Sequence, residues 1–511
     1  MKRLIISLIL TLSLPLLAHG ENQLAADQIR TEVDKIKVPA LNLFRQYLSI
    51  ANDGHKPDDI ANLTQWVEAE FNKRGFTTSR LATPENPLIY AKRMVGAKRT
   101  ILVYLQADGQ PVDRSAWYQE NPYEAVLRKS DNNVWQKGEW QDISWDNIKG
   151  DIDPDWRIYA RSASDSKGPN TQFLKALDVL ENLGVSTDFN LKVVIDTEEE
   201  LSSPHLPQAV LDNREELASD MLLIFDGPPH RSGAPTLAFG ARGIAEMTLT
   251  TYGPKVAQHS GHYGNYIPNP AFHLARILSS MKSADGRVLI DGYYDGVEIS
   301  DQVRAILAAV PNNEAQLQKN MGFSTPDQVA DSLELSIQYP SLNIRGMSSA
   351  WVGKQARTII PAIATAEIDM RLVKESDPVY LVGLIKDHIS NLGYSIIDHE
   401  PTDEERQNHK NLVRLNYDIA YPAFRTEFDS SVGRFARSAL VHLNAKEPIL
   451  LRTMGGSIPI SPFVDTLNIP ALSVPTVNPD NNQHSPNENI RVGNFIDGIA
   501  TIAAVLAQKV E

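Results

Sequence analysis

Acidic residues follow several apolar runs of this 511-residue chain, in a pattern that suggests a metal site. The candidates, with one histidine, are Asp108, Asp165, Glu199, Glu200, Asp226 and His484. Carboxylates that converge repel one another, and a divalent cation offsets that repulsion. Oxygen ligands with one or two imidazoles suit zinc, manganese or cobalt, and a further acid can act as general base. Because any single acid taken alone is more often a helix cap or a loop residue, the prediction depends on the whole set.

Short apolar runs alternate with helical patterns in the part of the chain that carries most of these acids. The runs cover residues 101–105, 191–195 and 221–225, and a helical pattern covers 171–183. Apolar strands that alternate with helices indicate an α/β sheet that is at least partly parallel. Ligands of such sheets gather beyond the carboxyl ends of the strands, which is where the acids are placed.

The pattern changes after Gly243. Alternation of apolar and polar residues at 245–251 and 364–372 predicts half-exposed strands, and residues 380–392 have a helical pattern. Strands with one solvent-exposed face, together with helices, predict a separate α+β layer inserted into the first domain. The predicted domains are a signal peptide at 1–20, a catalytic domain at 21–242 and 427–511, and an inserted lid and dimerisation domain at 243–426.

The amino terminus and the composition restrict the class of protein. A basic start, an apolar run over residues 4–17 and the closing Ala18-His19-Gly20 match a secretory signal peptide, which predicts a periplasmic or secreted protein. The run is short for a membrane span of about 20 residues, so we expect no stable membrane insertion. The net charge of −14 argues against a nucleic-acid partner, and the absence of cysteine excludes disulfides and thiolate ligands.

Several short motifs, taken together and in order, resemble metallopeptidase family twenty, which includes carnosinases, glutamate carboxypeptidases, acetylornithine deacetylases and succinyl-diaminopimelate desuccinylases. The motifs are Trp117-Tyr118, Asn121-Pro122-Tyr123, 164–169, 197–203, His259-Ser260-Gly261, 455–459 and 484–488. The similarity covers nearly all of the chain after residue 20 and is closest to the carnosinase-like dipeptidases. It implies a zinc-peptidase-like catalytic domain with a mixed, largely parallel sheet, plus the inserted domain.

The resemblance also implies roles for the acids. The metal ligands would be Asp165, which would bridge two ions, Glu200 and His484 at one ion, and Asp226 at the other. Glu199 would be the general base that takes a proton from the attacking water. Asp108 would lie behind a metal-ligating side chain and hold its orientation.

Residues of the later motifs would bind substrate. The resemblance implies that His259 reaches the active site of a partner subunit in a homodimer and stabilises the oxyanion. Arg371 resembles the arginine that clamps the substrate carboxylate, a task that suits a guanidinium. The turn containing Gly456 and Ser457 would offer backbone donors to a small peptide. His230 and His262 are further candidates because they lie near these motifs.

One residue departs from the family pattern. Gln106 occupies the place of a metal-binding histidine, and its amide oxygen is a weaker ligand for zinc than imidazole. The site of Asp226 would therefore be weak, hold a harder metal or be empty, so that one or two ions are expected. Zinc is the first expectation for the metal, with manganese and cobalt as alternatives.

The motif set predicts a metal-dependent exopeptidase, of dipeptidase or carboxypeptidase type, that hydrolyses small peptides with an activated water. Two alternatives remain open at this point. One is an N-acyl amino-acid amidohydrolase of the same fold, and the other is a non-catalytic peptide-binding homologue. The intact Glu199, Glu200, Asp226 and His484 disfavour the second alternative.

Overall fold

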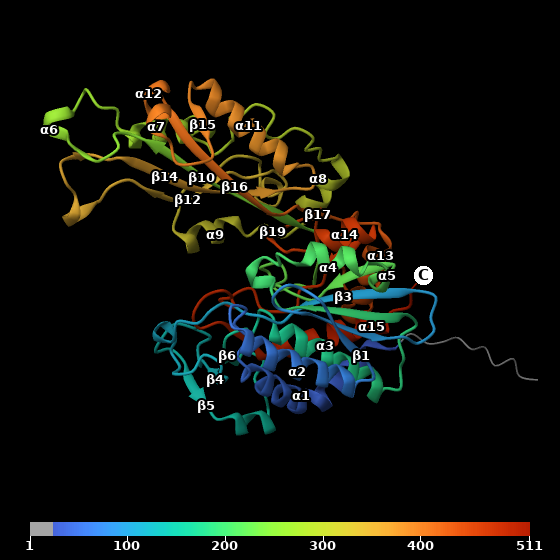
Figure 1. Cartoon of the computed structure of the whole chain (residues 1–511). Helices are drawn as coiled ribbons and strands as arrows, with labels where there is room; N and C mark the ends of the chain where they lie inside the picture. Colours follow the sequence, from blue (N-terminus) through green and yellow to red (C-terminus); the bar gives the residue numbers. More distant parts are fainter. Residues whose placement is uncertain (1–23, 511) are drawn as a thin grey trace, which may run out of the picture.

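The computed structural model describes residues 24–510, which form two layers of strands and helices stacked one above the other (Figure 1). The lower layer contains an eight-stranded sheet of order β1-β2-β7-β3-β8-β20-β9-β18. Its strands are β1 (Thr77–Leu81), β2 (Leu88–Arg93), β3 (Thr100–Gln106), β7 (Asn190–Asp196), β8 (Met221–Ile224), β9 (Thr236–Ala238), β18 (Ile449–Leu451) and β20 (Ala471–Ser473). Strand β3 pairs in parallel with β7 and β8, whereas β1 and β2 run antiparallel at one edge. The predicted mixed sheet with a parallel centre is confirmed.

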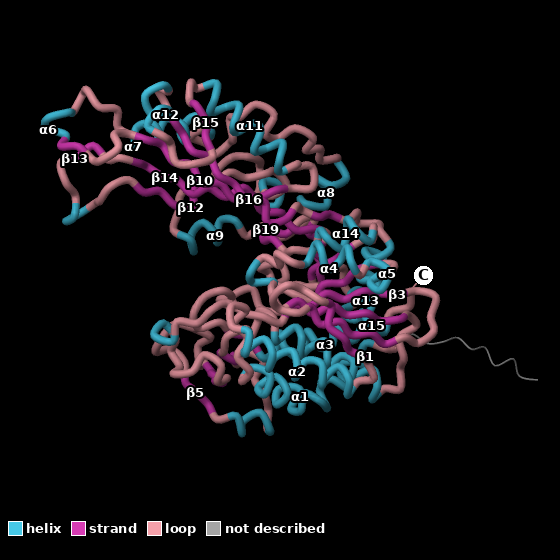
Figure 2. The backbone as a smooth tube through the Cα atoms, viewed as in Figure 1, coloured by secondary structure: helices cyan, strands magenta, loops and turns pink. Residues whose placement is uncertain are grey.

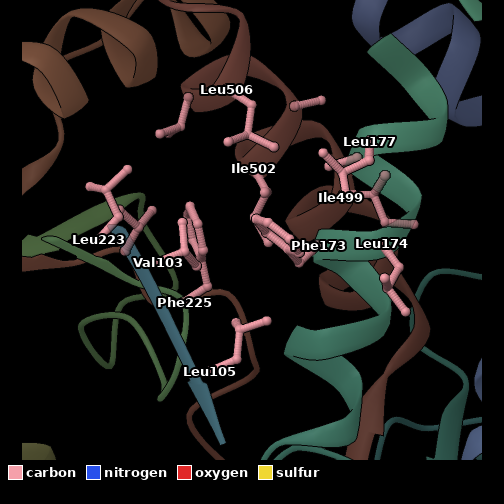
Figure 3. Close-up of a cluster of buried hydrophobic side chains, with 14 of the residues drawn as sticks. Val103, Leu105, Phe173, Leu174, Leu177, Leu223, Phe225, Ile499, Ile502 and Leu506 are labelled. Atoms are coloured by element: carbon pink, nitrogen blue, oxygen red, sulfur yellow. The ribbon is translucent and has the colours of Figure 1, made fainter. Parts of the chain in front are cut away.

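Helices cover both faces of this sheet. One face packs on α1 (Ala26–Leu48), α2 (Pro57–Lys73), α3 (Lys167–Asn182), α13 (Ser431–Asn444) and α15 (Val492–Ala507), and the other on α4 (Leu206–Asp212), α5 (Arg214–Leu217) and α14 (Ser461–Leu467). In β3, Val103 and Leu105 point to the first face, where Phe173 of α3 and Ile502 of α15 meet them (Figure 3). Tyr104 points to the second face. Each such side chain contributes about 1.5–3 kcal/mol when fully buried, so β3 is held firmly from both sides.

A small sheet of order β21-β6-β4-β5 brings two distant loops together. Its strands are β4 (Val126–Lys129), β5 (Gln141–Ile143), β6 (Arg157–Tyr159) and β21 (Asn489–Arg491), and the short 3₁₀ helices at Arg114–Ala116 and Trp145–Lys149 flank it. Strand β6 leads into the loop of Asp165, and β21 follows the loop of His484. Because Tyr159 pairs with Asn489, these two loops are adjacent although more than 300 residues separate them.

The upper layer is built around a second sheet of order β12-β14-β10-β16-β15, with β17 and β19 also paired to β10. Its strands are β10 (Gly240–Tyr252), β12 (Asn343–Ser348), β14 (Ile363–Leu372), β15 (Ser395–Ile397), β16 (Leu412–Tyr421), β17 (Phe424–Arg425) and β19 (Met454–Ser457). The helices of this layer are α7 (Pro270–Met281), α8 (Asp301–Ala308), α9 (Glu314–Met321), α10 (Leu333–Ser336), α11 (Pro378–Asn391) and α12 (Asp403–Asn408). Burial alternates strictly along β14, so the prediction of strands with one buried face is confirmed.

The two layers meet where β9 continues into β10 after a single residue, Phe239. Strands β16 and β19 also reach this junction (Figure 2). At the far end of the upper layer, β11 (Gln258–His259) pairs with β13 (Ile359–Ile360) next to α6 (Ser260–Tyr263) (Figure 2). Within residues 24–510, no helix is long and apolar enough to cross a membrane. The domain boundaries at 242 and 426 stay predictions.

Candidate metal and peptide site

Three predicted ligands converge at the junction of the layers. The ligand atoms of Asp165, Glu200 and His484 all lie within 4.8 Å of one another. His484 Nε2 is 2.9 Å from Asp165 Oδ2 and 3.4 Å from Glu200 Oε2. Bonds of about 2.1 Å to a tetrahedral zinc would place two ligand atoms roughly 3.4 Å apart, so the three side chains are close to the spacing that one ion requires.

The electrostatics of this group favour a cation. Burial, followed by the neighbouring Asp165 carboxylate, raises the pKa of Glu200 and likewise that of Asp226. The hydrogen bond to Asp165 raises the pKa of His484. Besides burial, these shifts share a contribution from concentrated negative charge. Since a bound dication would offset that charge, the donor set fits a divalent metal ion.

A buried glutamate holds the loop that carries Asp165. Glu488 accepts hydrogen bonds from the backbone N–H groups of Ser162, Ser164 and Asp165 at 2.9–3.0 Å. Its carboxylate also pairs with Arg161 at 2.8 Å, and both side chains are at most 3% exposed. Glu488 follows His484 by four residues, so one loop supplies a predicted ligand and fixes the position of another.

Asp108 orients the turn that carries Glu199 and Glu200. It lies fully buried beyond the end of β3, and its two carboxylate oxygens accept the N–H groups of Glu199 at 3.1 Å and Glu200 at 3.0 Å. These residues begin the 3₁₀ helix Glu199–Leu201. Asp108 was predicted to lie behind a metal-ligating side chain and hold its orientation. In the structure it instead holds the backbone of the turn that carries Glu200, through these two hydrogen bonds.

Glu199 lies beside the three converging ligands and lines the cavity described below. Burial, followed by the charges of Glu200 and Asp165, raises its pKa well above the usual range of a glutamate. A carboxyl group with a raised pKa can both accept and return a proton near neutral pH. The arrangement is suited to the predicted general base.

Gln106 and Asp226 lie on the other side of Asp165. Gln106 Nε2 donates to Asp165 Oδ1 at 2.6 Å, and Ser166 Oγ lies 2.6 Å from Asp226 Oδ1 and 3.1 Å from Asp165 Oδ1. Asp226 does not join the group of three, within the part of the chain that the structure describes. This side of Asp165 is therefore occupied by hydrogen-bond donors.

A cavity of about 1190 Å³ opens between the two layers above these residues. Its floor contains Asp165, Glu199 and Glu200, and its upper wall includes residues of α9 and α10. The volume exceeds that of a typical small-molecule pocket, so there is room for a short peptide.

The predicted substrate residues lie on the wall of this cavity. Arg371 is the residue before the last of β14 and donates to Ser457 Oγ at 2.7 Å. Gly456 and Ser457 belong to β19, which pairs with β10 at the junction. A half-exposed guanidinium that a neighbouring hydroxyl holds in place can bind a carboxylate with two parallel hydrogen bonds.

His259 does not lie in the cavity of its own chain. It is exposed in β11, directly before α6, and its ring contacts that of His262. Helix α6 lies at the end of the upper layer farthest from the junction (Figure 1). His230, in contrast, lines the cavity. Of the two further histidine candidates, His230 therefore lies at the cavity and His262 lies beside His259. From this position, His259 could act only in the site of another molecule.

Several contributors to the site were not predicted. Gln110 donates to Glu200 at 2.8 Å, Gln483 donates to Asp165 at 3.2 Å, and Tyr421 at the end of β16 lines the cavity. Neutral amides and a tyrosine carry no signal in a search for acids and histidines. For Gln483, its position immediately before His484 was a signal that could have been used.

The fold and the site define a metallohydrolase-like protein with an α/β layer, an inserted α+β layer and a candidate carboxylate–histidine metal site between them. A family model described as the peptidase dimerisation domain matches residues 239–396, close to the predicted insertion. The Cys-Gly metallodipeptidase of Saccharomyces cerevisiae is 26% identical over 80% of this chain and 79% of its own length. The human Beta-Ala-His dipeptidase is 24% identical over 81% of this chain and 75% of its own.

Solved structures agree with these matches. An M20 family metallo-carboxypeptidase from Sulfolobus solfataricus has a TM-score of 0.73 and 25% identity, covering 92% of this chain and 98% of its own. A dinuclear metal binding peptidase of the M20 family from Bacillus subtilis has a TM-score of 0.53 and 8% identity over 93% of this chain and 98% of its own, which shows the fold alone. The chain is similar to M20 peptidases over most of its length, and the predicted resemblance is confirmed.

The prediction of an exported, periplasmic or secreted protein is wrong. The relatives that match most of the chain are dipeptidases of yeasts and mammals, and these matches do not support an exported location. The prediction depended on the signal-peptide pattern of residues 1–20, which lie outside the described residues. A basic start followed by a short apolar run is a weak pattern without a second observation to support it.

Proposed function

We propose that this protein is a metal-dependent dipeptidase that hydrolyses small peptides with free termini. The convergence of Asp165, Glu200 and His484 on the floor of a peptide-sized cavity is the observation that carries the proposal. The names of the relatives, Cys-Gly metallodipeptidase and Beta-Ala-His dipeptidase, support a dipeptide as substrate.

Asp165, Glu200 and His484 would hold the ion, for which zinc is the first choice and manganese or cobalt are alternatives. An ion at this position supplies a Lewis acid that polarises the peptide carbonyl and acidifies water. Glu199 then accepts a proton from the water that attacks the carbonyl carbon, and returns it to the amine nitrogen that leaves. Asp108 holds Glu199 and Glu200 in position through their backbone N–H groups.

The remaining site residues would bind the substrate. Arg371, supported by Ser457, would hold the carboxylate of the peptide at the wall of the cavity. Gly456 would offer its backbone to the peptide. His259 would stabilise the oxyanion in the site of a partner subunit, because it lies far from the cavity of its own chain, and this role requires a homodimer.

The substitution Arg371→Lys is expected to raise KM for dipeptides about tenfold or more. Lysine keeps the charge but loses the paired donors, and a hydrogen bond to a charged group contributes about 1.5–3 kcal/mol, where 1.4 kcal/mol is tenfold. Steady-state kinetics measure the effect. Arg345→Lys is the matched control, because Arg345 lies in β12 and pairs with Glu246 outside the cavity. Equal KM values for the two variants would contradict the assignment.

A substrate panel tests the proposed function. Free dipeptides are compared with N-acetylated amino acids that carry the same carboxyl-terminal residue, in the presence of zinc, manganese or cobalt. A dipeptidase hydrolyses the first group faster. Preference for the acetylated compounds would assign the site to an N-acyl amino-acid amidohydrolase, and binding of dipeptides without hydrolysis under every ion would leave a peptide-binding homologue.

A further inference from the structure

The two carboxylate oxygens of Asp165 face different surroundings. Oδ2 lies 2.9 Å from His484 Nε2, within the group of three predicted ligands, and also accepts from Gln483 Nε2 at 3.2 Å. Oδ1 faces the amide of Gln106 at 2.6 Å and the hydroxyl of Ser166 at 3.1 Å. Oδ2 thus faces an imidazole that can ligate a metal, whereas the two neighbours of Oδ1 are a neutral amide and a neutral hydroxyl.

The distances on the Oδ1 side are those of hydrogen bonds. Gln106 Nε2 to Asp165 Oδ1 and Ser166 Oγ to Asp226 Oδ1 are both 2.6 Å. Two ligand atoms on one zinc would be roughly 3.4 Å apart with bonds of about 2.1 Å, a spacing that the 2.9 Å and 3.4 Å distances from His484 Nε2 to Asp165 and Glu200 approach more closely. Ser166 also links Asp226 to Asp165 through its hydroxyl, so the space between the two aspartates contains a side chain.

The orientation of the Gln106 amide supports the same conclusion. Its Oε1 is buried without a hydrogen-bond partner among the described residues. Asn170 Nδ2 donates to the backbone oxygen of Gln106 at 2.7 Å and helps to fix its backbone. Turning the amide over would set Oε1 against Asp165 Oδ1 and would give up the hydrogen bond that Nε2 donates to that oxygen. The amide is therefore set to donate to Asp165.

We propose that each protomer holds a single metal ion, at Asp165, Glu200 and His484, and that Gln106 and Ser166 replace a second ion by donating hydrogen bonds to Asp165 and Asp226. This inference rests on the proposed function for the first ion. It makes Asp226 a hydrogen-bonded neighbour of the site, and it distinguishes this chain from a dinuclear peptidase. Neutral hydrogen-bond donors thus contact the carboxylate oxygens that a second ion would otherwise bind.

The test is the metal stoichiometry of the purified full chain. Protein loaded with Mn²⁺ and then dialysed is expected to contain one ion per protomer by elemental analysis, with the EPR spectrum of isolated Mn²⁺. Gln106→His is expected to bind a second ion about 10–100-fold more tightly than the parent chain and to show spin coupling between two Mn²⁺ ions. Circular dichroism checks that the variant is folded.

Two further variants sharpen the result. Asp226→Asn in the parent chain is expected to keep one ion, and in the Gln106→His chain it is expected to remove the second ion. Two ions of similar affinity in the parent chain would overturn this inference and leave the proposed function intact. No ion in the parent chain would overturn both. The parent chain alone decides the question if Gln106→His does not fold.

Discussion

The substitution Glu199→Gln is expected to lower kcat for dipeptide hydrolysis by about 10²–10⁴-fold and to leave the metal content of the protein unchanged. Glutamine has the shape of glutamate but cannot accept the proton of the attacking water. Glu199 stands beside the three converging ligands without belonging to that group, so its loss removes proton transfer and leaves the ion in place.

Steady-state kinetics and elemental analysis of the same preparation measure both halves of this prediction. Glu215→Gln is the matched control, because Glu215 is exposed in α5 on the surface of the lower layer. It is expected to keep the parental kcat. Hydrolysis by Glu199→Gln at a rate within threefold of the parent would assign the base to another residue. Loss of metal together with activity would instead make Glu199 a ligand.

The substitution Glu488→Ala is expected to lower the free energy of unfolding by about 3–5 kcal/mol and to weaken metal binding. It leaves the buried guanidinium of Arg161 without its counter-ion and leaves the N–H groups of Ser162, Ser164 and Asp165 without their acceptor. These contacts hold the loop of Asp165. The substitution is therefore expected to displace a predicted metal ligand, although Glu488 itself is not one of the predicted ligands.

Urea unfolding of the metal-free protein measures the free energy of unfolding, and titration with zinc measures the affinity of the protein for the metal. Glu488→Gln is the informative comparison, since its amide oxygen can still accept some of the N–H groups but offers no charge to Arg161. An intermediate loss of stability is expected for it. A change below about 1 kcal/mol for Glu488→Ala, in the range of ordinary surface substitutions, would show that the loop is held by other contacts.

The centre of the fold could be predicted from the sequence because its strands are apolar on both faces. The run at 101–105 could only be a strand buried from both sides or part of a buried helix, and its length of five residues favours the strand. The structure places it in β3 at the middle of the sheet. Once that strand is placed, the acids that follow it, and those that follow β7 and β8, must lie at one edge.

The small sheet that joins the two site loops could not be predicted. Strands β6 and β21 have three residues each, too few for any periodicity to appear. Their pairing brings the Asp165 loop to the His484 loop, and the contact between them depends on Glu488, whose neighbours in sequence give no indication of its burial. The resemblance to a peptidase family supplied this part of the site, and physical reasoning from the residues did not.

The hydrogen-bond donors around the acids could not be predicted from the sequence either. Gln110 and Gln483 contact predicted metal ligands, and Ser166 contacts both Asp165 and Asp226, yet glutamine and serine are common in polar loops. Gln106 stood out only because the family pattern has a histidine at its position. Its orientation, with the amide nitrogen toward Asp165, required coordinates.

The dependence of hydrolysis on metal tests the central claim most directly. The purified protein is treated with a chelator, dialysed, and assayed with a free dipeptide before and after zinc, manganese or cobalt is added back. Hydrolysis is expected to disappear with the metal and to return with it, and His484→Ala, which removes an imidazole ligand, is expected to prevent the recovery at matched ion concentrations. Hydrolysis that persists in metal-free protein, or its absence under every ion, would contradict the account.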